Sequence, residues 1–166
     1  MKIRKFLAVT LAMALCVTCI AVFAAGAADG ADGLSITLQI GNPIMTVNGQ
    51  EKEIDPGMGT APVVINDRTL LPVRAVVEEF GGTASWNESA QEVTLEYGSD
   101  TIRLTIGSDA AYLNGESYTL DTAPTIINDR TMLSIRFIAE SFGFSVGWND
   151  AEQIVTISGS DGAGAA

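Results

Sequence analysis

The stretch that decides the fold is TAPTIINDRTMLSIRFIAESFGFSVGWND, residues 122–150, because the chain contains it twice. Residues 60–88 read TAPVVINDRTLLPVRAVVEEFGGTASWNE and align with it at an offset of 62. Upstream the alignment continues at an offset of 66, with Asn48-Gly49 matching Asn114-Gly115 and Asp55 matching Asp121. The difference is a four-residue insertion, residues 56–59, in the first copy only. Repetition of this extent indicates an internal duplication.

Both copies predict the same order of elements. Apolar and polar residues alternate over 34–40 and 101–106, the period of a half-buried strand. The Asn-Gly pairs that follow adopt the positive φ angles of a type I′ turn at little cost, so each marks a hairpin. Apolar residues then recur with helical spacing and end at a glycine, Gly81 or Gly143. Short strands that contain Trp86 and Trp148 close the copies.

We therefore predict an α+β fold of antiparallel sheets and hairpins packed on short helices, built from two duplicated units. Copy one covers about residues 34–97 and copy two about 98–158. In copy one the closing strands run on into residues 101–106, whereas only small residues follow Ile157, so copy two lacks one element. Residues 28–33 are predicted to be a flexible spacer and residues 159–166 a disordered tail.

The first 27 residues have the three parts of a secretory signal peptide. Lys2, Arg4 and Lys5 precede an apolar run, and small residues follow it. Cleavage after Ala24 or after Ala27 fits, and an uncleaved membrane anchor is the alternative. Both cysteines of the chain lie inside this segment, so the mature protein has no thiol and no disulfide.

Composition excludes several classes of function. The chain has 9 Lys and Arg against 20 Asp and Glu, which disfavours nucleic acid as a partner. It has no His, which removes most zinc and copper sites and any nucleophile paired with histidine. No phosphate loop, serine elbow or calcium loop is present. We expect no catalytic residue, no metal site and no cofactor, and therefore no enzyme.

The repeated Asn-Asp-Arg-Thr is the most conspicuous polar motif. Asn and Asp favour tight turns through hydrogen bonds to the backbone, so we interpret the motif as structural. The alternative is a polar binding face formed by Asp67, Arg68, Asp129 and Arg130. On the predicted helices, Arg74 with Glu78 and Arg136 with Glu140 have the i,i+4 spacing of surface ion pairs.

Trp86 and Trp148 occupy equivalent places beside apolar strand residues. We expect them to cover the core of each copy, with each indole N–H donating a hydrogen bond to a nearby group. The alternative is a pair of exposed platforms on which sugar rings stack. Exposure of the two indoles distinguishes these interpretations.

The whole motif string, from TAP through NDRT, the helix and WN to Gln91 or Gln153, resembles the copper amine oxidase N-terminal-like, or stalk, domain family. One departure is Ser134, where the family has the proline found here as Pro72. The resemblance implies an antiparallel sheet packed on short helices in secreted or surface proteins of Gram-positive-type bacteria. It implies no oxidase activity, because that chemistry uses histidine copper ligands in a separate domain.

Two functions follow as hypotheses. The first is a secreted, non-catalytic stalk or spacer domain of the cell surface that acts through contacts with an extracellular protein, including self-association by a strand edge. The second is a module that binds the cell wall or a polysaccharide through Trp86, Trp148 and the Asn-Asp-Arg turns. A membrane is a partner only if the leader stays uncleaved.

Overall fold

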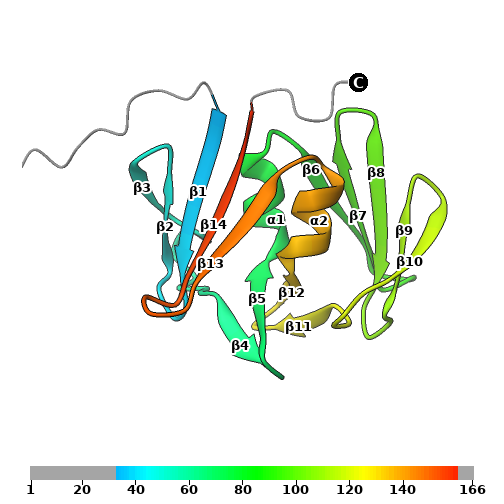
Figure 1. Cartoon of the computed structure of the whole chain (residues 1–166). Coiled ribbons are helices and arrows are strands. Elements are labelled where there is room, and N and C mark those ends of the chain that lie inside the picture. Colours follow the sequence, from blue (N-terminus) through cyan, green and yellow to red (C-terminus); the bar gives the residue numbers. More distant parts are fainter. Residues whose placement is uncertain (1–32, 161–166) are drawn as a thin grey trace, which may run out of the picture.

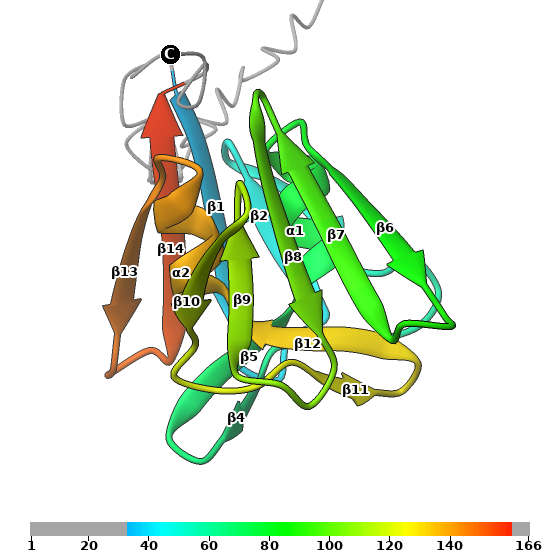
Figure 2. The same ribbon diagram turned by 90° about the vertical axis from the view of Figure 1, so that its right-hand side faces the viewer.

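The computed structural model describes residues 33–160, which fold into antiparallel sheets and two short helices. Two five-stranded sheets face each other with both helices between them, and a four-stranded sheet closes one end (Figures 1 and 2). The predicted antiparallel sheets packed on short helices are therefore confirmed. Within residues 33–160, no helix is long and apolar enough to cross a membrane.

The first five-stranded sheet joins the two ends of the described chain. Its strands, in order, are β13 (Ser145–Asn149), β14 (Ile154–Ser160), β1 (Gly33–Gln39), β2 (Ile44–Val47) and β3 (Gln50–Glu53). β1 and β14 pair over their full length, from Gly33 opposite Ser160 to Gln39 opposite Ile154. The first and last strands therefore lie side by side (Figure 1).

The second five-stranded sheet is built in the same order from one continuous stretch of chain. Its strands are β6 (Thr83–Asn87), β7 (Glu92–Tyr97), β8 (Asp100–Thr105), β9 (Ala110–Leu113) and β10 (Glu116–Thr119). Here a tight turn connects β7 to β8, whereas β14 and β1 meet without a connection. β1 thus supplies the element that copy two lacks in the sequence. The predicted boundary at residues 97 and 98 falls in that turn, so each sheet combines strands from both copies.

The four-stranded sheet places the two copies against each other. It comprises β11 (Thr125–Ile127), β12 (Arg130–Ser134), β5 (Arg68–Pro72) and β4 (Val63–Ile65). In its central pair Leu71 lies opposite Leu133, which is its own counterpart 62 residues on. Pro72 faces Met132 and Leu70 faces Ser134, so the pairing is reciprocal, as at an interface with twofold symmetry.

The helices α1 (Val73–Glu79) and α2 (Ile135–Ser141) lie where the spacing of apolar residues predicts them. Their buried faces carry Val73, Val76, Val77 and Phe80 in one copy and Ile135, Ile138, Ala139 and Phe142 in the other. Each helix ends before a glycine with positive φ, +83° at Gly81 and +82° at Gly143. Ser134 makes no capping hydrogen bond with its side chain, yet α2 is as long as α1, so serine in place of proline does not shorten the helix.

Four aromatic rings join the copies at the centre of the core. Phe80 stacks on Phe144 with ring centroids 4.2 Å apart, and Tyr97 contacts both rings. Tyr97 also lies 5.4 Å from Phe142. The position 62 residues after Gly82 is Phe144, and the one 62 after Tyr97 is Gly159. The aromatic residue thus precedes β13 in one copy and ends β7 in the other, and each faces a glycine position in the opposite copy's alignment, so that all four rings pack in one cluster.

The ends of the predicted domain need correction. β14 continues to Ser160 and β1 begins at Gly33, so residues 159–160 are not tail and residue 33 is not spacer. Small residues gave no apolar signal there, but a strand is held by backbone pairing, which glycine and serine also provide. The predicted signal peptide, the rest of the spacer and the remaining tail lie outside the described residues.

Candidate functional site

The Asn-Asp pairs of the repeated motif form the tips of two hairpins. Asn66 and Asp67, between β4 and β5, have φ of 51° and 60°, and Asn128 and Asp129, between β11 and β12, have φ of 49° and 59°. Two consecutive residues with positive φ define a type I′ turn, and Asn and Asp tolerate this conformation better than other side chains. The tight turns predicted for these Asn-Asp pairs are therefore present at both places.

The arginine after each turn binds an aspartate of the other copy. Arg130 forms a bidentate pair with Asp55, with Nε 2.5 Å from Oδ2 and Nη2 3.2 Å from Oδ1. Arg68 Nε donates to Asp121 Oδ2 at 2.7 Å. The two contacts are reciprocal, since each joins equivalent residues of opposite copies. They fix the position of both turns relative to the loops that enter the four-stranded sheet.

Sequence analysis missed the two aspartates as site residues. The available signal was that Asp55 and Asp121 repeat together with the arginines, although nothing local shows that they meet. The hydrogen bond from Arg130 holds the pKa of Asp55 below its usual range against the opposing effect of burial. The Thr60 hydroxyl, which donates to Asp55 Oδ2 at 2.8 Å, lowers that pKa further. The same pairing raises the pKa of Arg130, so both groups remain charged at neutral pH.

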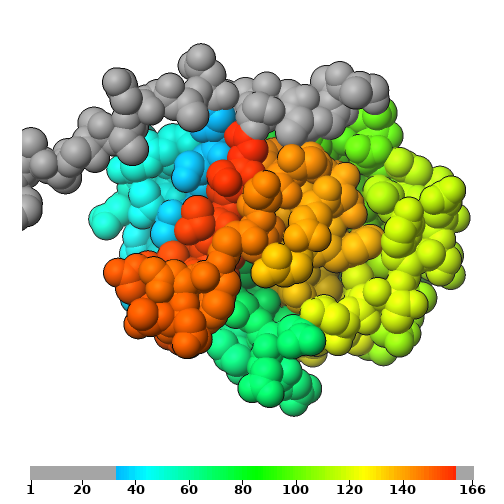
Figure 3. Space-filling model, viewed as in Figure 1, coloured from blue at the N-terminus to red at the C-terminus, as the bar shows by residue number. Residues whose placement is uncertain are grey.

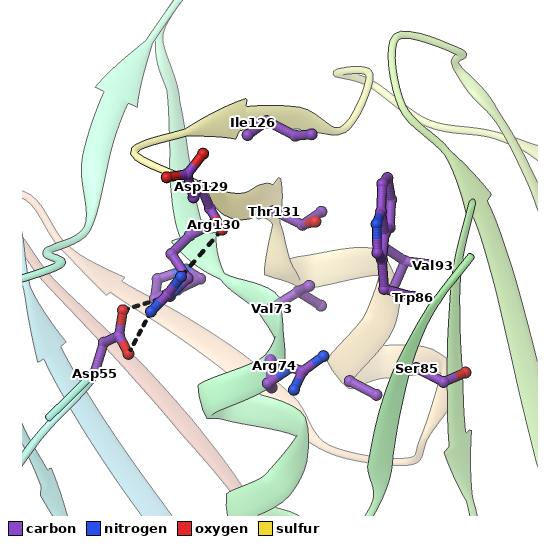
Figure 4. A pocket seen from close by; sticks show the side chains of 12 residues that line it. Asp55, Val73, Arg74, Ser85, Trp86, Val93, Ile126, Asp129, Arg130 and Thr131 are labelled. Carbon is purple, nitrogen blue, oxygen red and sulfur yellow. Dashed lines mark hydrogen bonds and ion pairs between the residues drawn. The ribbon is translucent and has the colours of Figure 1, made fainter. Parts of the chain in front are cut away.

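A pocket of about 560 Å³ lies beside the Arg130–Asp55 pair. Figure 4 shows Asp55, Asp129 and Arg130 on one side, Trp86 and Ser85 on the opposite side, and Arg74 below Val73 between them. Val73, Ile126 and Thr131 line the space between them. Its volume is within the range of about 300–1,000 Å³ that is typical of sites for small molecules. We call it the Trp86 pocket.

A second pocket, of about 370 Å³, is built from the equivalent residues with the roles of the two copies exchanged. Its lining includes Trp148, Asp67, Arg68, Asp121 and Arg136. Figure 3 shows the surface hollowed where the orange β13 hairpin, the gold α2 and the green turn between β4 and β5 meet. We call it the Trp148 pocket. The structure therefore groups the six predicted binding residues into two sets, each with a tryptophan of one copy and an Asp-Arg pair of the other.

The expectation that the tryptophans cover the core is wrong. Trp86 is 39% exposed and Trp148 41% exposed, and each lines its pocket. Both face inward in the alternation of their strands, since Trp86 lies opposite the buried Val93 and Trp148 opposite the buried Val155. A helix of seven residues is only about 10 Å long, whereas a strand of five spans about 17 Å. Val73 and Arg74, at the start of α1, line the Trp86 pocket, so the short helix begins beside the indole and does not cover it.

The helix arginines differ between the pockets. Arg136 Nη1 lies 3.3 Å from Glu140 Oε1 and donates to the Val146 carbonyl at 3.3 Å, so its predicted i,i+4 pair forms. The corresponding pair of Arg74 with Glu78 does not form. Among residues 33–160, no carboxylate oxygen lies within 4.0 Å of Arg74. The guanidinium of Arg74 instead borders the Trp86 pocket.

These groups are suited to binding a ligand. An exposed indole face stacks on sugar rings or cations, and charged side chains orient a polar ligand. No group of three potential metal ligands occurs among the described residues.

Comparison with known proteins identifies the family. Residues 53–157 match the model of the copper amine oxidase N-terminal domain. No curated protein matches the chain. The match spans most of the described fold, including both tryptophans, both Asn-Asp-Arg turns and both arginine–aspartate pairs, and more than half of the chain. The chain therefore belongs to the copper amine oxidase N-terminal domain family.

Proposed function

We propose that this protein is a secreted, non-catalytic domain of the bacterial cell surface that binds wall polysaccharide through its two tryptophan pockets. The observation that carries the proposal is the exposure of both indoles at the mouths of equivalent pockets. The chain has two tryptophans, and both are placed in this way. A domain that serves only as a spacer has no need of indoles in such positions, where they could otherwise complete the core.

The two pockets together suit a repeating polymer. Each is assembled from both copies, so the reciprocal pairing of β5 with β12 fixes their relative position. A polymer with two units of suitable spacing engages both pockets, and the second contact is then intramolecular. Such bivalent binding raises the apparent affinity by a factor of about 10²–10⁴ when the geometry permits it.

Sedimentation with Gram-positive cell-wall sacculi tests the proposal. We expect saturable co-sedimentation of the purified protein that falls strongly in Trp86→Ala and in Trp148→Ala. Tyr112→Ala is the matched control, because Tyr112 is also 39% exposed but lines neither pocket. Protein that stays in the supernatant, or equal loss in the Tyr112 variant, contradicts binding through the pockets.

Secretion is part of the proposal and rests on the leader sequence. A basic head, an apolar run and a small-residue exit support export and cleavage after Ala24 or Ala27. N-terminal sequencing of protein recovered from the culture medium or the cell surface tests it. Recovery in the cytoplasm with the first residue intact contradicts export.

The stalk or spacer role through protein contacts is the second candidate. Val64 on β4 and Ile126 on β11 are 46% and 43% exposed, and both strands are edges of the four-stranded sheet. Exposed apolar residues on unpaired edges favour association with a protein or with a second copy. A molar mass that rises with concentration, and that returns to the monomer value in Val64→Ser, supports this role.

A further inference from the structure

Four charged side chains line the Trp86 pocket, and two of them already neutralise each other. Asp55 accepts hydrogen bonds from Arg130 with both of its carboxylate oxygens. Arg130 also donates to the backbone carbonyl of Asp129 at 3.1 Å, while the Asp129 carboxylate points away from Arg130 (Figure 4). Arg74 lies between the Asp55–Arg130 pair and Trp86. It is therefore the charged residue in the middle of the pocket.

The guanidinium of Arg74 is free to bind a ligand. The residue is exposed, and no carboxylate oxygen of residues 33–160 lies within 4.0 Å of it. In the Trp148 pocket the equivalent arginine, Arg136, lies 3.3 Å from Glu140 and donates to the Val146 carbonyl at 3.3 Å. The Trp86 pocket therefore has an unpaired cation at the place where the Trp148 pocket has a neutralised one.

From this difference we infer that the Trp86 pocket binds a saccharide unit that carries a carboxylate, as a uronic acid does. The inference rests on the proposed function and names the ligand class of one pocket. The sugar ring stacks on the indole of Trp86, and the carboxylate pairs with Arg74. A guanidinium suits this role because its planar fork binds both oxygens of a carboxylate through parallel hydrogen bonds. Both arginines of the Trp148 pocket are paired with carboxylates, so that pocket does not distinguish a carboxylated sugar from a neutral one.

The charge of the whole chain favours a carboxylate over a polyphosphate. The chain has 20 Asp and Glu against 9 Lys and Arg, so it repels a polymer with a negative charge on every unit. Arg74 balances the one charge of a carboxylate but not the two charges of a phosphate monoester. We therefore expect a polymer in which carboxylated units are interspersed with neutral ones, with the neutral units available to the Trp148 pocket.

Single-tryptophan proteins test the inference in each pocket separately. Trp148→Phe leaves Trp86 as the only indole, and Trp86→Phe leaves Trp148. Tryptophan emission is titrated with cellobiose, with cellobiouronic acid, and with cellobiose that bears a phosphate on the hydroxymethyl group oxidised in cellobiouronic acid. The three probes share both sugar rings, so they differ only in the group at one position.

In the Trp148→Phe protein we expect cellobiouronic acid to bind about five- to tenfold more tightly than cellobiose, because a hydrogen-bonded charge pair is added. Adding Arg74→Gln removes this preference. Arg103→Gln is the matched control, because Arg103 is also exposed but lies over the Tyr112 ring and lines neither pocket, so the preference stays. In the Trp86→Phe protein, cellobiose and cellobiouronic acid bind equally.

Equal affinity for cellobiose and cellobiouronic acid in the Trp148→Phe protein, or a preference that survives Arg74→Gln, overturns the inference. Tighter binding of the phosphorylated probe overturns the choice of a carboxylate. Sacculi that sediment the wild-type protein through its tryptophans then leave the proposed function standing. An intact preference for cellobiouronic acid without sedimentation instead overturns the proposed polymer and keeps the ligand class, so the two failures are distinguishable.

Discussion

Replacing Gly159 with alanine tests the part of the fold that carried the weakest sequence signal. A Cβ at residue 159 would lie 2.4 Å from Cδ1 and 2.9 Å from Cε1 of Phe144. Non-bonded carbon atoms pack best at about 3.5–4.0 Å, so the ring would have to move by about 1 Å. The ring is also stacked on Phe80 with centroids 4.2 Å apart, which restricts that movement. The substitution overpacks the aromatic cluster.

Overpacking of a closed core costs about 1–3 kcal/mol. We expect Gly159→Ala to lower the free energy of unfolding by about 2 kcal/mol, which corresponds to roughly 8 °C in Tm for a fold of this size. Urea unfolding followed by circular dichroism measures it, and the midpoint falls by roughly 1 M with an unchanged slope. Gly147→Ala on the adjacent strand is the control, because its nearest neighbour would be the Thr156 carbonyl oxygen at 3.8 Å.

Equal stability of the two alanine variants would refute the reasoning. It would mean that the last residues of β14 do not pack against Phe144, and that the sheet ends where the apolar residues end. A second check is Phe144→Leu combined with Gly159→Ala. The shorter side chain relieves the clash, so the loss in the double variant is smaller than the sum of the two single losses.

Three further outcomes are expected. The hydrogen bond from Arg130 is the main cause of the lowered folded-state pKa of Asp55, so the Asp55 carboxylate stabilises the fold above about pH 4, and this contribution disappears as the pH falls through the folded pKa. Urea titrations at several pH values measure it: Asp55→Asn reduces the loss of stability at acid pH, and an unchanged loss would argue against the pair. Asn66→Ala places alanine at positive φ and lowers stability by about 1–2 kcal/mol, whereas Asn66→Gly is nearly neutral; equal thermal shifts would contradict the turn geometry. In the variants Trp148→Phe and Trp86→Phe, which each keep one tryptophan, acrylamide quenches the emission of Trp86 and Trp148 to similar extents. Blue-shifted emission that acrylamide does not quench would place that tryptophan in the core.

Local patterns predicted much of the fold. The helix positions follow from the spacing of Val73, Val76 and Val77, and the hairpin tips follow from Asn-Gly and Asn-Asp, whose backbone preferences need no distant partner. The partner of β14 could not be predicted in this way, because it is β1, more than a hundred residues earlier in the chain. Backbone pairing does not require apolar side chains, whereas the sequence pattern detects a strand only by them, so residues 159–160 were predicted to be tail.

The candidate site was only half predictable. The sequence singled out the tryptophans and the Asp-Arg pairs, and the alternative hypothesis joined them in one binding module. The favoured interpretation, however, placed the tryptophans over the core and treated the Asp-Arg motif as structural. Alternation along a strand shows which face Trp86 occupies, while its exposure depends on how far α1 extends over that face. Asp55 and Asp121 became part of the site only when Arg130 and Arg68 reached across to them.

The sequence by itself determined the repeat, the elements within each copy and the acidic, histidine-free chemistry, because these depend on composition and on neighbours a few residues apart. Only the tertiary structure decided that the copies exchange strands, that each arginine binds the aspartate of the other copy, and that each tryptophan stands at the mouth of a pocket. The physical reason is that these features arise where surfaces from distant segments meet. Their geometry is set by the length of the short helices and by the reciprocal pairing of β5 with β12.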